Sequence, residues 1–166
     1  VDPTRLTPDP LDGQRFLTGL SEFVEKGGGL LMLAGPQYNP QAYVGSPIEE
    51  LLPVILGKEA PPGSPLVHPM PPDSQRPHPV VLFSSDPEEN QSLWQTSAPL
   101  WWYQPVERLR PGATAWLVNP NHENRFGPHV LAASIFAPDG WVGWIGMDAT
   151  WRWRFPGGER YVDRFW

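Results

Sequence analysis

The sequence predicts a single α/β domain over residues 1–166, and three observations point to that fold class. A helical spacing of apolar residues ends at Gly27-Gly28-Gly29, which supplies a helix terminator. The apolar run 30–34 follows, and its brevity favours a strand buried on both faces, as in a parallel sheet covered by helices. Residues 130–136 and 141–147 flank the turn sequence 137–140 (Ala-Pro-Asp-Gly) and predict a β-hairpin.

The elements of the first half follow from apolar spacing and from turn residues. The first helix is expected to begin at Asp9 as N-cap, with Pro10 at the first helical position, and to end at Lys26. After the strand 30–34, residues 35–40 form a loop at its C-terminal end, where open α/β sheets usually bind ligands. Residues 46–52 predict a short helix capped by Ser46. Residues 60–79 contain eight prolines and predict an irregular surface excursion.

The second half contains weaker signals before the hairpin. Residues 80–83 predict a short strand or extended segment, residues 88–97 a weak helix or turn, and residues 114–118 a strand. Beyond the hairpin, apolar residues from Tyr161 to Trp166 recur at helical spacing and predict a C-terminal helix. Trp151 and Trp153 would share one face if their segment is extended, and burial against that helix is the favoured interpretation.

Composition limits the classes of function. The 40% hydrophobic content of 166 residues is enough for a core. A formal net charge of -6 argues against a general affinity for nucleic acid or anionic membranes. The absence of cysteine excludes disulfides, thiolate metal sites and thiol nucleophiles. No apolar run approaches the roughly 20 residues of a membrane helix, and both ends read as cut from a longer protein.

Four stretches carry a family resemblance: FVEKGGGLLMLAGP at 23–36, LLPV at 51–54, LRPGATAWL at 109–117, and GWIGMDATWRWRF with RYVDRFW at the C-terminus. Together they resemble the class I glutamine amidotransferase-like domain of large bacterial membrane proteins, which often also carry von Willebrand factor type A-like domains. The resemblance implies a flavodoxin-like three-layer sheet that is incomplete at the N-terminus, because a strand normally precedes the segment matched by Val1-Asp2-Pro3. It also implies a soluble domain of a bacterial membrane protein, on a side of the membrane that stays open.

The residues at the family's catalytic positions argue against glutamine hydrolysis. Active relatives place a Cys nucleophile at a sharp turn after the strand matched by residues 30–34, and a His-x-Glu pair after a late strand. This sequence has Ala-Gly-Pro-Gln at 34–37 and Asp-Ala-Thr at 148–150, which supply neither a thiol nor an imidazole. Loss of both groups removes covalent catalysis. The resemblance therefore implies a pseudoenzyme, a non-catalytic binding or scaffold domain whose partners are neighbouring domains of a parent protein or another protein.

The candidate ligand-binding residues follow the predicted strands at 30–34 and 141–147, where a ligand of an α/β sheet is expected to approach. They are Gly35, Pro36, Gln37, Tyr38, Asp148, Trp151 and Arg152. One alternative is a hydrolase or amidotransferase-like enzyme of altered chemistry, with Asp148 as base and Arg152 as electrostatic stabiliser. Another is a carbohydrate-binding module, which requires at least two coplanar exposed rings; Trp101 and Trp102 lie in a second aromatic concentration.

Neither a metal nor a cofactor is expected. The four histidines at 68, 78, 122 and 129 lack metal-ligand spacing. The three glycines at 27–29 precede a strand instead of joining a strand to a helix, which is the wrong arrangement for a phosphate-binding loop. Nucleic acid is not expected as a partner, and membrane contact is expected only through segments outside this chain.

Overall fold

The structure is a computed structural model that describes residues 10–58, 66–137, 139–157 and 159–166. The expected N-cap Asp9, the segment matched by Val1-Asp2-Pro3, the first part of the proline-rich excursion and Pro138 of the hairpin turn lie outside them. The α-helices are α1 (Pro10–Glu25), α2 (Pro47–Leu51), α3 (Pro87–Gln95), α4 (Arg154–Gly157) and α5 (Glu159–Phe165). The strands are β1 (Gly29–Leu33), β2 (Val54–Leu56), β3 (Val106–Leu109), β4 (Thr114–Asn124), β5 (Gly127–Ala137) and β6 (Gly140–Ile145). Short 3-10 helices are η2 (Gln41–Tyr43), η3 (Pro79–Val81) and η4 (Thr150–Trp153).

The described strands form a mixed four-stranded sheet of order β1-β6-β5-β4 and a separate pair, β2-β3. Only β1 and β6 run parallel in the four-stranded sheet, with Gly29 opposite Trp141 and Leu33 opposite Ile145. The β4–β5, β5–β6 and β2–β3 pairs are antiparallel. The expectation of a flavodoxin-like three-layer fold is therefore wrong, because such a fold is built on a parallel sheet and this one is mainly antiparallel.

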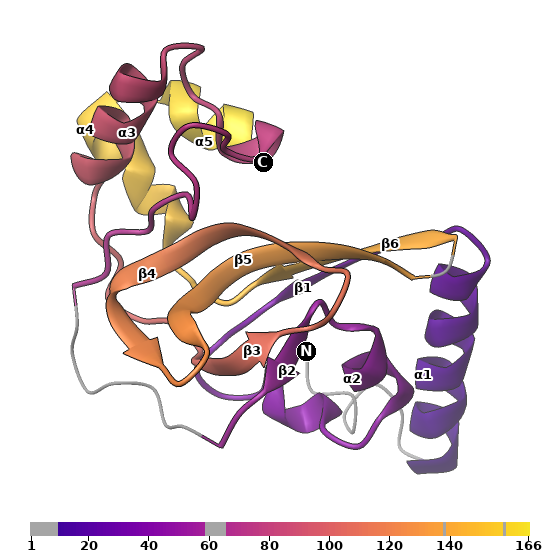
Figure 1. The fold of residues 1–166 in the computed structure, drawn as a ribbon. Coiled ribbons are helices and arrows are strands. Elements are labelled where there is room, and N and C mark those ends of the chain that lie inside the picture. The colour runs from indigo at the N-terminus through magenta and orange to yellow at the C-terminus, as the bar shows by residue number, and fades with distance from the viewer. Residues whose placement is uncertain (1–9, 59–65, 138, 158) are drawn as a thin grey trace.

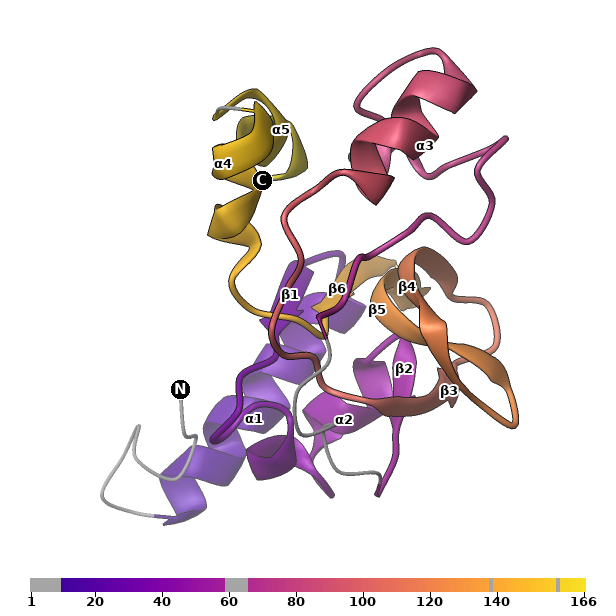
Figure 2. The same cartoon turned by 90° about the vertical axis from the view of Figure 1, so that its left-hand side faces the viewer.

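Two hydrophobic cores lie on opposite faces of the four-stranded sheet. Figures 1 and 2 show α3, α4 and α5 above one face, and α1, α2 and the β2–β3 pair on the other side. We call the first the α3–α5 core; its largest buried residues include Trp94, Tyr103, Trp116, Leu131, Ile145, Trp153 and Phe165. The second, the α1–α2 core, includes Leu17, Val24, Ile48, Leu52, Val106, Val130 and Trp144. The neighbours Val130 and Leu131 enter different cores, because successive side chains of a strand point to opposite faces.

The helix-glycine-strand unit that begins the described chain matches the sequence prediction in its elements but not in its burial. α1 ends one residue before the predicted Lys26, and Gly27 has a φ of 100°, which favours glycine. β1 follows as predicted. It was expected to be buried on both faces, yet Leu31 and Leu33 are 40% and 44% exposed. Among the described residues β6 alone pairs with β1, so β1 lies at an edge of the sheet.

Three further features differ from the sequence prediction. The apolar run 80–83 is not a strand: Pro79 starts η3, and Nδ1 of His78 accepts a hydrogen bond from the Val80 N–H at 3.4 Å. β4 continues to Asn124, well beyond the predicted end at residue 118. The β2–β3 pair was not predicted at all. The described part of the proline-rich excursion, residues 66–78, contains no helix and makes only isolated bridges, in which Val67 pairs with Leu100 and Met70 with Val118.

The weak helix prediction near residue 90 corresponds to α3, and side-chain hydrogen bonds stabilise this helix near both of its ends. Oδ1 of Asp86 accepts hydrogen bonds from the backbone N–H groups of Glu88 and Glu89, at 2.8 and 3.3 Å, and Pro87 is the first helical residue. Near the C-terminal end, the indole N–H of fully buried Trp94 donates to the Val81 carbonyl at 2.9 Å. The Asp86 bonds cap the helix, and the Trp94 bond holds α3 against η3 within the α3–α5 core.

Candidate functional site

The loops that follow β1 and β6 leave the sheet at the same end, because these two strands are parallel neighbours. The loop 35–38 follows β1, and Asp148 follows β6. The structure thus places the two groups of sequence-predicted residues at one end of the sheet, the end at which ligands of α/β sheets approach.

Hydrogen bonds tie the loop after β1 to the exit of β6 through Gln104. The Gly35 N–H donates to the Asn39 carbonyl at 3.0 Å, which closes the loop on itself. Nε2 of Gln41 donates to Oε1 of Gln104 at 2.6 Å, and the Gln104 N–H donates to the Gly146 carbonyl at 2.7 Å. Gln104 is buried, whereas Gln41 is exposed, so the link is shielded from water only at its Gln104 end. Pro36, Gln37 and Tyr38 stay exposed at the surface of the loop.

Asp148 is partly buried at the exit of β6. Burial raises the pKa of its carboxyl, and its own backbone N–H opposes that rise. Among the described residues Asp148 forms no ion pair with Arg152 or Arg154. The base and the electrostatic stabiliser that an altered enzyme would need are therefore not paired here.

The chain turns sharply after Asp148, and this turn separates the two tryptophans. Ala149 has a φ of 58° and is followed by the 3-10 helix η4. Trp153 is 2% exposed and packs edge-on against Trp94 and Phe165, with ring centroids 5.3 and 5.1 Å apart. Trp151 is 51% exposed. The prediction that both rings are buried against the C-terminal helix is confirmed for Trp153 and wrong for Trp151, because the segment is helical and not extended.

Arg152 lies between exposed aromatic rings, a group that we call the aromatic shelf: Trp101, Trp151, Arg152 and Phe155. Nε of Arg152 donates to the Pro99 carbonyl at 3.1 Å, and its Cζ lies 3.8 Å from the Trp101 ring centroid and 6.0 Å from that of Trp151. Trp101 and Phe155 are 58% and 74% exposed. Cation–π contact and the carbonyl bond therefore fix the guanidinium at the surface.

The predicted site residues fall into two groups that do not touch. Trp151 and Arg152 belong to the aromatic shelf, whereas loop 35–38 leads into η2, whose Gln41 hydrogen-bonds with Gln104. Within the described part of the chain, no hydrogen bond, ion pair or ring contact joins that loop to Asp148 or Arg152. The prediction missed Phe155 and did not place Trp101 in the site; the signal for Trp101 was present, because it stands in the aromatic run 101–103.

A buried aromatic and imidazole cluster beside the β6 exit was also missed. The Tyr103 hydroxyl hydrogen-bonds with Nδ1 of His122, and the rings of His122 and His129 lie 4.7 Å apart. Tyr103 and His129 are buried, and the contacts of Tyr103 with both histidines join β4 and β5 to the segment after α3. From the sequence, the histidines are considered only as metal ligands. Among the described residues no group of three or more His, Cys, Asp or Glu could hold a metal ion.

Comparison with known proteins supports the fold and corrects the family resemblance. No protein-family model matches the chain, and neither does any curated protein. Among solved structures it is similar to the cytoplasmic protein STM3548 from Salmonella typhimurium, with a TM-score of 0.63 and 20% identity over 89% of this chain. It is also similar to the cytoplasmic protein STM1381 from Salmonella typhimurium LT2, with a TM-score of 0.57 and 20% identity over 91% of this chain. The chain spans 57% of the length of each of these two proteins.

These findings overturn two expectations taken from the resemblance. The chain is not assigned to the glutamine amidotransferase-like domains, because no family model matches it and its sheet is mixed. The expectation of a soluble domain from a bacterial membrane protein is likewise wrong, because both structural neighbours are described as cytoplasmic proteins. In the part of the chain that the structure describes, no helix is long and apolar enough to cross a membrane.

Proposed function

We propose that this chain is a non-catalytic binding domain that engages another protein through the aromatic shelf. One observation carries the proposal: the Arg152 guanidinium is held 3.8 Å from the Trp101 ring centroid while Trp101, Trp151 and Phe155 are each more than half exposed. Tryptophan and arginine dominate the energetics of protein interfaces, and rings already fixed in place lose little entropy on binding.

The charge of Arg152 indicates the chemistry of the partner. Its guanidinium has no carboxylate within ion-pair distance among the described residues. A protein surface that presents an Asp or Glu beside apolar side chains would satisfy the arginine and cover the rings at the same time.

The geometry favours a protein partner over the two alternatives. Sugar binding needs coplanar exposed rings, but Arg152 covers one face of Trp101, and Trp151 meets Phe155 edge-on with 76° between ring planes. Catalysis by Asp148 and Arg152 needs the two groups to converge, and the arginine points to Pro99 and Trp101 instead. The proposal therefore leaves Asp148 without a catalytic role.

Photo-crosslinking in the native host tests the proposal. A benzophenone amino acid placed at Trp151 or Phe155 is expected to capture a discrete protein partner. The same group at Phe136 serves as the control, because Phe136 is 76% exposed but pairs with Trp141 at the opposite end of β6. Arg152→Gln should reduce capture about fivefold, as expected for loss of a charge-assisted hydrogen bond, while Arg154→Gln should not. Equal capture from position 136, no capture, or indifference to Arg152→Gln would overturn the proposal.

A further inference from the structure

A cavity of about 370 Å³ lies on the side of the molecule that carries β3, away from the aromatic shelf. One wall is β3 itself, residues 106–109, and the other is the turn of the β4–β5 hairpin with the first residues of β5. We call it the hairpin groove; Asn124 and residues 126–130 complete its lining. Its volume is within the range of pockets that hold small molecules.

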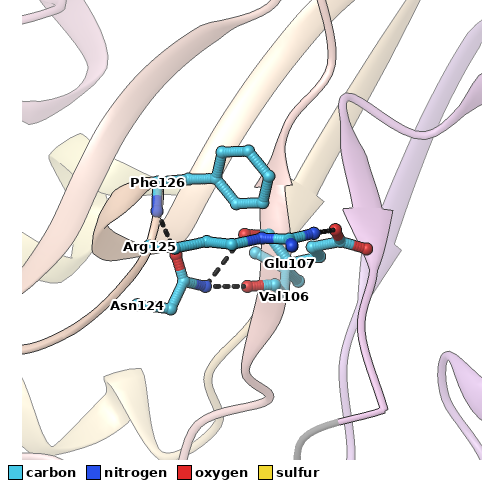
Figure 3. A network of polar contacts seen from close by, with 5 residues as sticks. All are labelled: Val106, Glu107, Asn124, Arg125 and Phe126. Carbon is cyan, nitrogen blue, oxygen red and sulfur yellow. Dashed lines mark hydrogen bonds and ion pairs between the residues drawn. The ribbon is translucent and has the colours of Figure 1, made fainter.

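Polar contacts fix the hairpin turn to β3 and so set the shape of the groove (Figure 3). Nδ2 of Asn124 donates to the carbonyls of Val106 and Glu107, at 3.3 and 2.8 Å. Oδ1 of the same side chain accepts from the Phe126 N–H at 2.8 Å. Nη2 of Arg125 contacts Oε1 of Glu107 at 2.7 Å. The two walls are thereby joined by a preorganised network, which lowers the cost of ordering them around a ligand.

The groove combines an aromatic ring with a cation, Arg108, that has no carboxylate partner among the described residues. Phe126 is 50% exposed, and the Cζ atoms of Arg125 and Arg108 lie 4.6 and 5.5 Å from its ring centroid. Glu107 neutralises Arg125, but no carboxylate of the described residues lies within ion-pair distance of Arg108. Arg108 therefore presents a local positive charge on a protein whose formal net charge is -6.

From this arrangement we propose that the hairpin groove binds a small molecule with a flat apolar body and a carboxylate or similar anionic group. The body packs against Phe126 and Pro128, which are exposed and supply apolar surface, and the anion pairs with Arg108. An adjoining cavity of about 560 Å³ shares Glu107 and Phe126 and reaches Lys58, which offers a cation for a second anionic group. This site lies on different elements from the aromatic shelf, and it goes beyond the proposed function.

A pair of matched probes tests the proposal on the full chain. 2-Naphthoate carries the flat body and the anion, and 2-naphthamide carries the same body without charge. Titrations of ¹⁵N-labelled protein, followed by NMR chemical shifts, should show naphthoate shifts concentrated at residues 106–109 and 124–130. The dissociation constant for naphthoate should be about fivefold lower than that for the amide, as expected for an added ion pair at a partly exposed site.

Three variants make the result decisive. Arg108→Gln should abolish the preference for naphthoate and leave amide binding unchanged. Glu107→Gln should strengthen naphthoate binding about twofold, because it releases the Arg125 guanidinium from its ion pair. Arg76→Gln is the control, since this arginine is exposed and pairs with Asp73, which does not line the groove. Any of four results would overturn the proposal: equal affinities for the two probes, shifts outside the groove, no effect of Arg108→Gln, or no shift at all. The last result applies at about 5 mM probe, a concentration that detects even very weak binding.

Discussion

Trp153 is predicted to hold the C-terminal segment on the sheet, whereas Trp151, two residues earlier, contributes little to stability. Trp153 is 2% exposed and contacts the rings of Trp94 and Phe165, while Trp151 is 51% exposed and contacts Phe155. A fully buried tryptophan truncated to alanine typically costs about 3–5 kcal/mol of folding free energy. Substitutions at exposed positions usually change stability by about 0.5 kcal/mol or less, and a half-exposed ring by about 1 kcal/mol.

One feature of Trp153 lowers its expected contribution. Its indole N–H is buried and has no acceptor among the described residues. Truncation removes that unsatisfied donor, which offsets part of the loss, since a buried unpaired donor costs about 1–3 kcal/mol. We therefore expect Trp153→Ala to lower the free energy of unfolding by about 3 kcal/mol, the low end of the range. Trp153→Phe should lose less, because phenylalanine keeps much of the ring contact and carries no donor.

Urea denaturation followed by far-UV circular dichroism measures these differences. The free energy of unfolding falls by about 2 kcal/mol per molar urea. Trp153→Ala should therefore lower the urea concentration at the unfolding midpoint by about 1.5 M, and Trp151→Ala by at most about 0.5 M. The two substitutions remove the same atoms two residues apart, so each is the control for the other. Equal shifts, or a larger shift for Trp151→Ala, would refute the assignment of Trp153 to the core and of Trp151 to the surface.

Two further predictions concern a close backbone contact and the partly buried carboxyl of Asp148. A Cβ at Gly140 would lie 1.9 Å from the Val24 carbonyl oxygen of α1, so Gly140→Ala should prevent normal docking of α1 and lower the melting temperature by more than about 10 °C. Gly19→Ala in α1 is the control, because a Cβ there meets open space and should raise the melting temperature slightly. Burial raises the pKa of Asp148 in the folded state, so the ionised carboxylate destabilises the fold at pH values above that pKa. As pH falls through the folded-state pKa, Asp148 becomes protonated and this destabilisation is lost. Asp148→Asn should therefore be more stable than the parent at pH 7, and thermal melts should show the gap closing as pH falls through the folded pKa; a gap that is constant from pH 7 to pH 3 would contradict this.

The sequence predicted correctly those elements that depend on residues close to one another in the chain. The glycine stop after α1 and the hairpin pairing of β5 with β6 depend on residues that are close in sequence, and both occur where expected. The β2–β3 pair depends on contacts across about fifty residues instead. Nε of Arg110 donates to the Leu52 carbonyl at 2.8 Å, and the Arg110 N–H donates to the Pro53 carbonyl, also at 2.8 Å. β2 and β3 have only three and four residues, so neither is long enough to show a periodicity that would predict the pairing.

The sequence predicted which residues belong to the candidate site better than it predicted how they are arranged. Trp151 and Arg152 were named from composition and position, but an extended chain would have put Trp151 and Trp153 on one face. The left-handed backbone at Ala149 and the turn of η4 separate them instead. A left-handed alanine has no sequence signature, because glycine or asparagine is the usual residue in that conformation. The exposed ring of Trp101 likewise became part of a site only when Arg152 was seen to pack on it.

The two proposed sites rest on different cores of one sheet, which lets them act separately. The aromatic shelf is anchored by Trp153 in the α3–α5 core, while the hairpin groove is walled by Val106 of the α1–α2 core. β5 joins them, because Val130 and Leu131 enter opposite cores. The charged groups of the two sites, Arg152 and Arg108, lie at the surface outside both cores, so removing either charge leaves the packing of β5 intact. Coupling between a partner on the shelf and a ligand in the groove would then pass through the central strands β5 and β6, because side chains of both strands pack into both cores.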